Sequence, residues 1–189
     1  MTEVLLSDKQ MLKLAGKGTK LMSYPDIGKY SSINELFGND NKIIILYLNE
    51  VSGDSMSGHW TCLIRRREGK NVVVEFDDSY SYAPDDELKW HSKSKQMEMG
   101  QDKNYLTHLL YQFSLQPNSI VEYNEDKLQS KGDSVATCGR FVALRCHFYK
   151  VPLKSYQTVW RGLKNDGYDL DEVAVYMSDL LNGSPIRQE

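Results

Sequence analysis

Four polar residues occur along the chain in the order His59, Asp78, Gln129 and Cys138. Thiol chemistry on a carbonyl group requires these residue types: a nucleophile, a base, an acid that orients the base, and a donor for the oxyanion. Each residue also has an ordinary explanation, because cysteine packs well in cores and the other three are common in loops or at strand ends. The chemistry therefore depends on whether the predicted elements bring the four together.

Cys138 lies in "DSVATCGRFVALR" (133–145), directly before a run that predicts a helix. The apolar residues that follow, among them Phe141, Val142 and Leu144, cover most of the helix circumference, so the helix is predicted to be central and buried. A cysteine at the first turn meets unpaired N–H groups and the positive end of the helix dipole, which stabilise a thiolate. From this segment alone, a core-filling cysteine is the alternative.

His59 is the histidine best placed to act as the base. It stands in "GHW", where a predicted Gly/Ser loop (51–58) enters a predicted strand (59–66), and such ends commonly carry catalytic groups. Another histidine is nine residues beyond Cys138 on the same predicted helix, roughly 13 Å away. That histidine is His147. Of the remaining two, His91 stands in a charged stretch and His108 stands among leucines of a predicted helix.

Two adjacent aspartates, Asp77 and Asp78, end the predicted strand 71–78. Alternation along a strand places them on opposite faces. Asp78 continues the apolar face, whereas Asp77 shares a face with Glu75, which marks that face as the wetter one. We expect Asp78 to orient the imidazole from the apolar face, although "DDSYS" alone also fits two turn residues.

Gln129 is nine residues before Cys138, in a loop that contains Gly132 and is long enough to fold back. Its side-chain amide and the backbone N–H of Cys138 are candidate donors to an oxyanion. An ordinary polar loop residue is the alternative interpretation of Gln129.

Together, "GHW", a strand ending in "FDDSY" and "Q…TCGR" resemble the adenain-like and SUMO-protease-like cysteine proteases, which share the order His, Asp/Asn/Glu, Gln, Cys. The segments "GHWTCLI", "DSYSYAPDDELKW", "LQSKGDSVATCGRFVALR" and "YPDIGKYSSINELF" are most similar to the capsid maturation proteases of virophages, such as Mavirus, and of Polinton elements. The resemblance spans nearly the whole chain. It implies that Asp78 is the acid, but the doubled aspartate departs from the Phe-Asp-Ser-Tyr pattern and keeps Asp77 a contender.

The resemblance implies a viral thiol endopeptidase that cleaves capsid precursors after glycine-containing sites during virion maturation. Trp60, beside the histidine, is expected to narrow the cleft so that glycine fits best. The implied partners are capsid proteins, and the implied locations are the host cytoplasm and the virion. Two alternatives stay open: an isopeptidase that removes a ubiquitin-like modifier, and an inactive capsid-associated scaffold.

The predicted fold class is α+β, with a central mixed sheet flanked by helices in a single domain, 1–189, of the papain-like or adenain-like kind. The nucleophile is expected at the start of a buried helix. Strands are predicted at 42–49, 59–66, 71–78 and 118–124, and helices at 7–16, 81–90 (after a turn), 104–115, 155–165 and 169–181.

Composition excludes several other classes. The formal net charge of −3 argues against nucleic acid or an anionic membrane as the main partner. No apolar run approaches the roughly 20 residues of a membrane span, and the first residues lack the pattern of a secretory signal. Three cysteines fit a reducing compartment, and no Cys or His pair has ligand spacing, so no metal or cofactor is implied. Cys62 and Cys146 are expected to be structural, although strand alternation also allows Cys62 to lie near the site.

Overall fold

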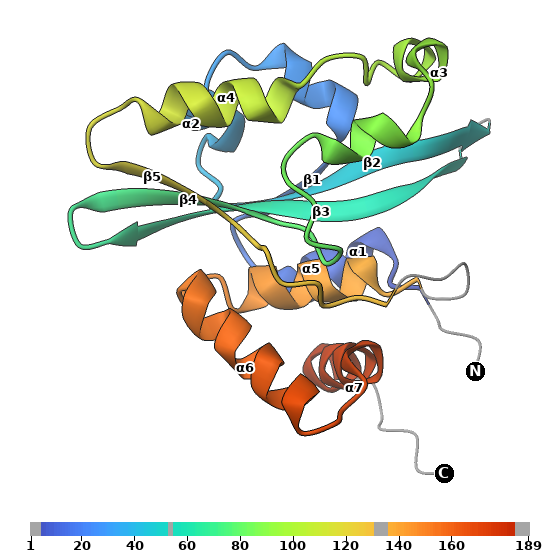
Figure 1. Cartoon of the computed structure of the whole chain (residues 1–189), viewed down its shortest axis with the longest axis vertical. Coiled ribbons are helices and arrows are strands. Elements are labelled where there is room, and N and C mark those ends of the chain that lie inside the picture. Colours follow the sequence, from blue (N-terminus) through green and yellow to red (C-terminus); the bar gives the residue numbers. More distant parts are fainter. Residues whose placement is uncertain (1–4, 53–54, 131–135, 184–189) are drawn as a thin grey trace.

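The computed structural model describes residues 5–52, 55–130 and 136–183 of the 189-residue chain. In this part of the chain, five strands form one sheet in the order β1-β2-β3-β4-β5 (Figure 1). The two outer pairs are parallel and the two inner pairs are antiparallel, so the sheet is mixed. The strands are β1 (Thr19–Ser23), β2 (Lys42–Ser52), β3 (Ser55–Glu68), β4 (Asn71–Asp77) and β5 (Ser119–Tyr123).

Helices cover both faces of the sheet (Figure 1). One face carries α1 (Asp8–Ala15), α5 (Cys138–His147), α6 (Leu153–Asn165) and α7 (Leu170–Asn182). The other carries the 3-10 helix η1 (Tyr24–Lys29), α2 (Ile33–Phe37) and α4 (Tyr105–Ser114). Between β4 and α4 the chain forms η2 (Asp86–Trp90) and α3 (Lys93–Glu98). The predicted α+β arrangement, a mixed sheet flanked by helices, is confirmed.

The position of β2 between two cores explains its continuous run of apolar residues. Ile44 points into the core beneath α5, while Ile43 and Ile45 point into the core beneath α4, and all three are fully buried. A strand covered on both faces cannot alternate between apolar and polar residues. The two cores therefore meet along this strand, and the sheet is anchored between them.

Helix α5 is the most enclosed helix of the fold, as its sequence predicts. Every residue from Cys138 to Cys146 is buried, and Cys138 is the first residue of the helix. Helix α1 packs beside it, and Met11 of α1 lies against Gly139. The predicted start of α1 is confirmed by a capping box, in which Ser7 and Gln10 bond each other's backbone N–H groups.

Two local predictions are wrong. The segment 51–58 is predicted as a loop, but β2 runs to Ser52 and β3 begins at Ser55, so cross-strand pairing outweighs its Gly and Ser content. Residues 53 and 54 of that segment lie outside the described residues. The segment 81–90 is predicted as a turn and a helix, but only the short 3-10 helix η2 forms after Asp85, whose φ of 68° is left-handed.

Glu75 does not mark a solvated face. Its side chain is completely buried, and its carboxylate accepts hydrogen bonds from Arg145 of α5, with Nε 2.6 Å from Oε1 and Nη2 2.8 Å from Oε2. Arg66 of β3 also donates to it. The counter-charge comes from a helix 70 residues further along the chain, which strand periodicity alone does not reveal.

Candidate active site

Cys138 begins α5, where the first N–H groups of a helix are unpaired. Its side chain is buried and interacts with the imidazole of His59. Burial by itself would raise the pKa of the thiol, but His59 and the backbone N–H groups of Trp60 and Gly139 hold that pKa below its usual value. The environment therefore stabilises the thiolate.

His59 stands in β3 and meets an acid on its other side. Its Nε2 is 3.1 Å from Oδ1 of Asp78, which leaves Nδ1 as the ring nitrogen for the thiol of Cys138. The ring of Tyr80 stacks on the imidazole, with the centroids 4.8 Å apart and the planes 17° apart. Although burial opposes a charged ring, the surrounding acids and the thiol raise the pKa of His59 well above its ordinary value. An imidazolium beside a thiolate is the favoured charge state.

The glycine before His59 has a steric function. A Cβ on Gly58 would come within 1.8 Å of the backbone oxygen of Tyr47, on the neighbouring strand β2. Tyr47 is also the cross-strand partner of His59. Only glycine lets the two backbones approach at this point, so it fixes where the imidazole leaves the sheet.

Asp78, and not Asp77, lies beside the imidazole. Asp78 follows the end of β4, and its Oδ1 also accepts the backbone N–H of Tyr80 at 2.7 Å, which holds the carboxylate in place. Asp77 is the last residue of β4 and pairs with Cys62 across the sheet. Within the described residues neither carboxylate oxygen of Asp77 has a hydrogen-bond partner, and burial raises its pKa to about 8.

Gln129 is held by the residue that follows Asp78. The hydroxyl of Ser79 donates to Oε1 of Gln129 at 2.7 Å, and the Ser79 carbonyl accepts the N–H groups of Leu128 and Gln129, each at 2.9 Å. With Oε1 occupied in this way, Nε2 is the donating end of the amide. Sequence reasoning missed Ser79, although its place inside "FDDSY" was a usable signal.

Asp171, near the start of α7, joins the two segments that carry Gln129 and Cys138. One oxygen accepts the backbone N–H of Ser130 at 2.9 Å, and the other accepts the hydroxyl of Thr137. Ser130 follows Gln129 and Thr137 precedes Cys138, so a single carboxylate restrains the neighbours of both residues. No sequence signal connects α7 with the other residues, so Asp171 is not predicted from the sequence.

A second acid, Glu87 of η2, lies at the imidazole. Its Oε1 is 3.5 Å from Nε2 of His59, and its side chain is buried. Ligand atoms of His59, Asp78 and Glu87 lie within 4.8 Å of one another, a spacing compatible with a metal ion. The same spacing arises wherever an imidazole hydrogen-bonds a carboxylate, so closeness alone does not make these residues metal ligands.

Trp60 and the other two cysteines separate into different environments. Trp60 of β3 is half-buried, and its ring lies against the start of α5, because a Cβ on Gly139 would be 3.4 Å from it. Cys62 and Cys146 are fully buried in the core and hydrogen-bond each other, and burial raises the pKa of Cys62. Cys62 therefore contacts the core and not the imidazole.

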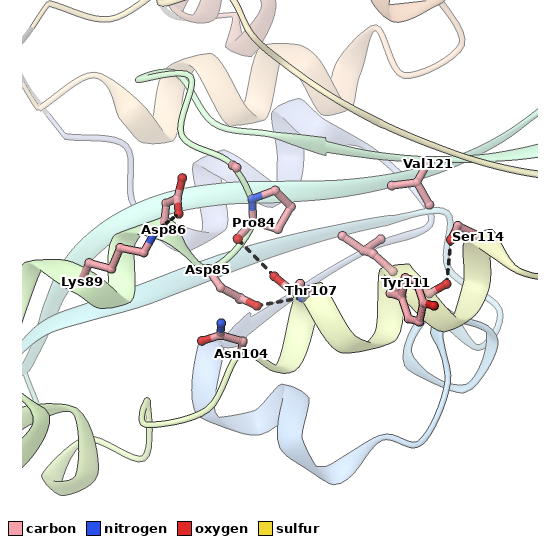
Figure 2. Close-up of a pocket in the computed structure, with 11 residues that line it drawn as sticks. Pro84, Asp85, Asp86, Lys89, Asn104, Thr107, Tyr111, Ser114 and Val121 are labelled. Carbon is pink, nitrogen blue, oxygen red and sulfur yellow. Dashed lines mark hydrogen bonds and ion pairs between the residues drawn. The ribbon is translucent and has the colours of Figure 1, made fainter.

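A pocket of about 440 Å³ lies on the α4 side of the sheet, away from the thiol. Figure 2 shows Pro84 and Asp85 on one side and residues of α4 on the other, with the carboxylate of Asp85 accepting the N–H of Thr107 at 2.7 Å. None of the residues around His59 and Cys138 described above lines it. The chemistry-bearing side chains thus lie elsewhere, at the junction of β3, β4 and α5.

Comparison with known proteins finds likenesses in sequence and in structure. No protein-family model matches the chain. The chain is 29% identical over 143 residues to the uncharacterized protein V9 of the Sputnik virophage, which covers 76% of this chain and 75% of that protein. Its structure is similar to the crystal structure of the ASFV pS273R protease, with a TM-score of 0.41 and 11% identity over 80% of this chain. The chain spans 61% of the length of that protease. None of the described helices is long and apolar enough to cross a membrane.

Proposed function

We propose that this chain is a cysteine endopeptidase. The observation that carries the proposal is the buried series of contacts from Cys138 through His59 to Asp78, with a thiol pKa held low at a helix start. These are the parts of a thiol nucleophile: a base within hydrogen-bond reach and an acid that orients the base.

The steps follow from the charge state. The thiolate of Cys138 attacks the carbonyl carbon of the peptide and forms a tetrahedral intermediate. His59, as an imidazolium, gives its proton to the departing amine, and a thioester remains on Cys138. His59, now neutral, takes a proton from the water that attacks the thioester; the acid product leaves, and the thiolate of Cys138 and the imidazolium of His59 are restored. Asp78 keeps the proton on Nε2 and so presents Nδ1 to the reacting groups.

The oxyanion is assigned to Gln129 and the backbone N–H of Cys138. The bonds from Ser79 to both the side chain and the backbone of Gln129 support this role, since an oxyanion donor must be held in place before charge develops. The positive end of α5 adds to the same electrostatic effect at Cys138.

We assign capsid precursors as substrates and glycine-containing sites as the points of cleavage. Trp60 supports the choice of glycine, because its indole lies against Gly139, the residue after the thiol, where it would narrow the approach for a substrate side chain. The likeness to a virophage protein supports a viral setting, with action in the host cytoplasm and in the virion. A ubiquitin-like modifier with a glycine end is the second candidate substrate, because the same narrow approach accommodates it.

The test is to incubate the protein with the viral capsid proteins and to locate new termini by mass spectrometry. Cleavage after glycine that disappears with Cys138→Ala is the expected result. Intact capsid proteins, together with release of a ubiquitin-like modifier from a fusion, would move the assignment to an isopeptidase. Failure to cleave either substrate, with an unreactive Cys138, would favour the inactive scaffold.

A further inference from the structure

Glu87 and Asp78 present two buried carboxyl groups to one imidazole. Their oxygens lie 3.5 and 3.1 Å from Nε2 of His59, and the two side chains are 3% and 0% exposed. A single acid is sufficient to orient an imidazole, as Asp78 does here. The second carboxyl group is therefore unexplained by the proposed reaction, although burying it without a partner is costly.

The hydrogen bonds around these groups are incomplete when both acids are ionised. Within the part of the chain that the structure describes, three carboxylate oxygens lack a hydrogen-bond partner: both oxygens of Glu87 and Oδ2 of Asp78. An ionised carboxylate only accepts hydrogen bonds, so two of them cannot satisfy each other. Oxygens of the two acids lie within 4.8 Å of each other, so one proton placed on Glu87 lets it donate a hydrogen bond to Asp78.

Charge leads to the same assignment. Among the described residues, the ionisable groups that act most strongly on Glu87 come from β2, β3, α5 and the segment after β4, and the imidazole is the cation among them. They are Tyr47, His59, Asp78, Tyr80 and Cys138. Ionising Glu87 as well as Asp78 and Cys138 would set three negative charges around one imidazolium in a buried site. Burial, and then the charge and hydrogen bond of Asp78, raise the pKa of Glu87 well above its ordinary value, although His59 opposes this.

Resting on the proposed function, we infer that Glu87 is a positioning residue: a protonated carboxyl group that donates to Asp78 and fixes this acid against His59. Asp78 then has three restraints, from Glu87, from the backbone of Tyr80 and from the imidazole. The pair of acids bears one negative charge, which matches the single charge of the imidazolium.

Infrared spectroscopy at pH 7 tests the protonation directly. Glu87→Gln is expected to lose the C=O stretch of one protonated carboxyl group, while Asp86→Asn, its ion-paired neighbour, is expected to lose only carboxylate bands. Any band from the buried Asp77 is present in all these proteins and cancels in the difference spectra. Loss of a carboxylate band in Glu87→Gln would overturn the inference.

Alkylation of Cys138 tests the positioning effect without any substrate. Glutamine can donate to Asp78 as a protonated acid does, so Glu87→Gln should stay within about threefold of the unmodified protein at pH 6–7. Glu87→Ala should react at least about tenfold more slowly, with circular dichroism confirming that it is folded. A folded Glu87→Ala with normal reactivity, or a Glu87→Gln as slow as alanine, would overturn the inference. An unreactive Cys138 in the unmodified protein would instead contradict the proposed function.

Discussion

The carboxylate of Asp171, on α7, accepts a hydrogen bond from the hydroxyl of Thr137, the residue directly before Cys138. Its other oxygen accepts the backbone N–H of Ser130, directly after Gln129. Cys138 and Gln129, the proposed nucleophile and oxyanion donor, are therefore positioned by the same side chain from a helix outside the site. Their relative placement depends on α7 remaining packed against α5.

We expect Asp171→Ala to lower kcat by about 10- to 100-fold, because small misplacements of catalytic groups have effects of this size. KM should change much less, since Asp171 is not placed at the substrate. Steady-state kinetics measures both values. The matched control is Glu172→Ala, an exposed neighbour on the same helix that should leave kcat unchanged. A folded Asp171→Ala with normal kcat would show that Gln129 and Cys138 keep their positions without this carboxylate.

Iodoacetamide should label Cys138 well before Cys62 or Cys146, because its thiol pKa is lowered and that of Cys62 is raised. His59→Ala removes the main group that lowers this pKa, so burial then dominates and the labelling profile moves to higher pH. Mass spectrometry of the labelled peptides over a pH series measures both effects. In turnover assays, Cys138→Ala should be inactive and His59→Ala should lose several orders of magnitude. Preferential labelling of either core cysteine would show that Cys138 is not the nucleophile.

Gln129→Ala should lower kcat by about 10²- to 10³-fold with little change in KM, the usual effect of losing one oxyanion donor. Ser79→Ala should shift kcat in the same direction but less, because the backbone bonds from Leu128 and Gln129 to the Ser79 carbonyl are kept. Ser130→Ala is the control, because only its backbone N–H bonds Asp171. A near-normal kcat for Gln129→Ala would return this residue to an ordinary loop role.

Gly58→Ala should destabilise the protein by about 1–3 kcal/mol, the range for overpacking, because its methyl group would meet the Tyr47 backbone. The activity of the folded variant should also fall, since His59 is the next residue. Gly162→Ala in α6 is the opposite control: nothing lies within 4 Å of its added Cβ, and alanine favours a helix by about 1 kcal/mol. Urea unfolding compares the two variants. Equal stability of Gly58→Ala and the unmodified protein would mean that β2 moves aside without cost.

Local patterns predict those residues whose place depends on their own element. Cys138 is found from a helix start, and the separation of Asp78 from Asp77 follows from strand alternation. The supporting residues Ser79, Glu87 and Asp171 act through contacts between distant segments, which no local pattern encodes. The prediction for Glu75 is wrong for the same reason. A charged residue inside a strand indicates a solvated face unless its buried partner is known, and that partner is Arg145 of α5. Contacts between specific distant residues thus determine the parts of the site that local sequence patterns do not predict.

Asp77 provides a test in which stability and catalysis separate. Its pKa is raised from 3.8 to about 8 by burial, so between these values the folded protein holds a proton that the unfolded chain has released. The stability that this proton contributes is complete below about pH 4 and is lost as the pH rises towards 8, by at most about 1.4 kcal/mol per pH unit. Asp77→Asn removes this dependence, so its stability relative to the unmodified protein should increase with pH across that window.

The catalytic consequence runs the other way. Asp77→Asn should retain most of its turnover, whereas Asp78→Asn should lose far more, because Asp78, and not Asp77, contacts the imidazole and an amide there can reverse its tautomer. Urea unfolding at several pH values and kcat measured on both variants check the two halves. If Asp77→Asn were the more damaging change, the imidazole would have to turn towards the other face of β4. If its relative stability did not vary with pH, Asp77 would be ionised in the fold, with Arg145 of α5 as the charge that compensates it.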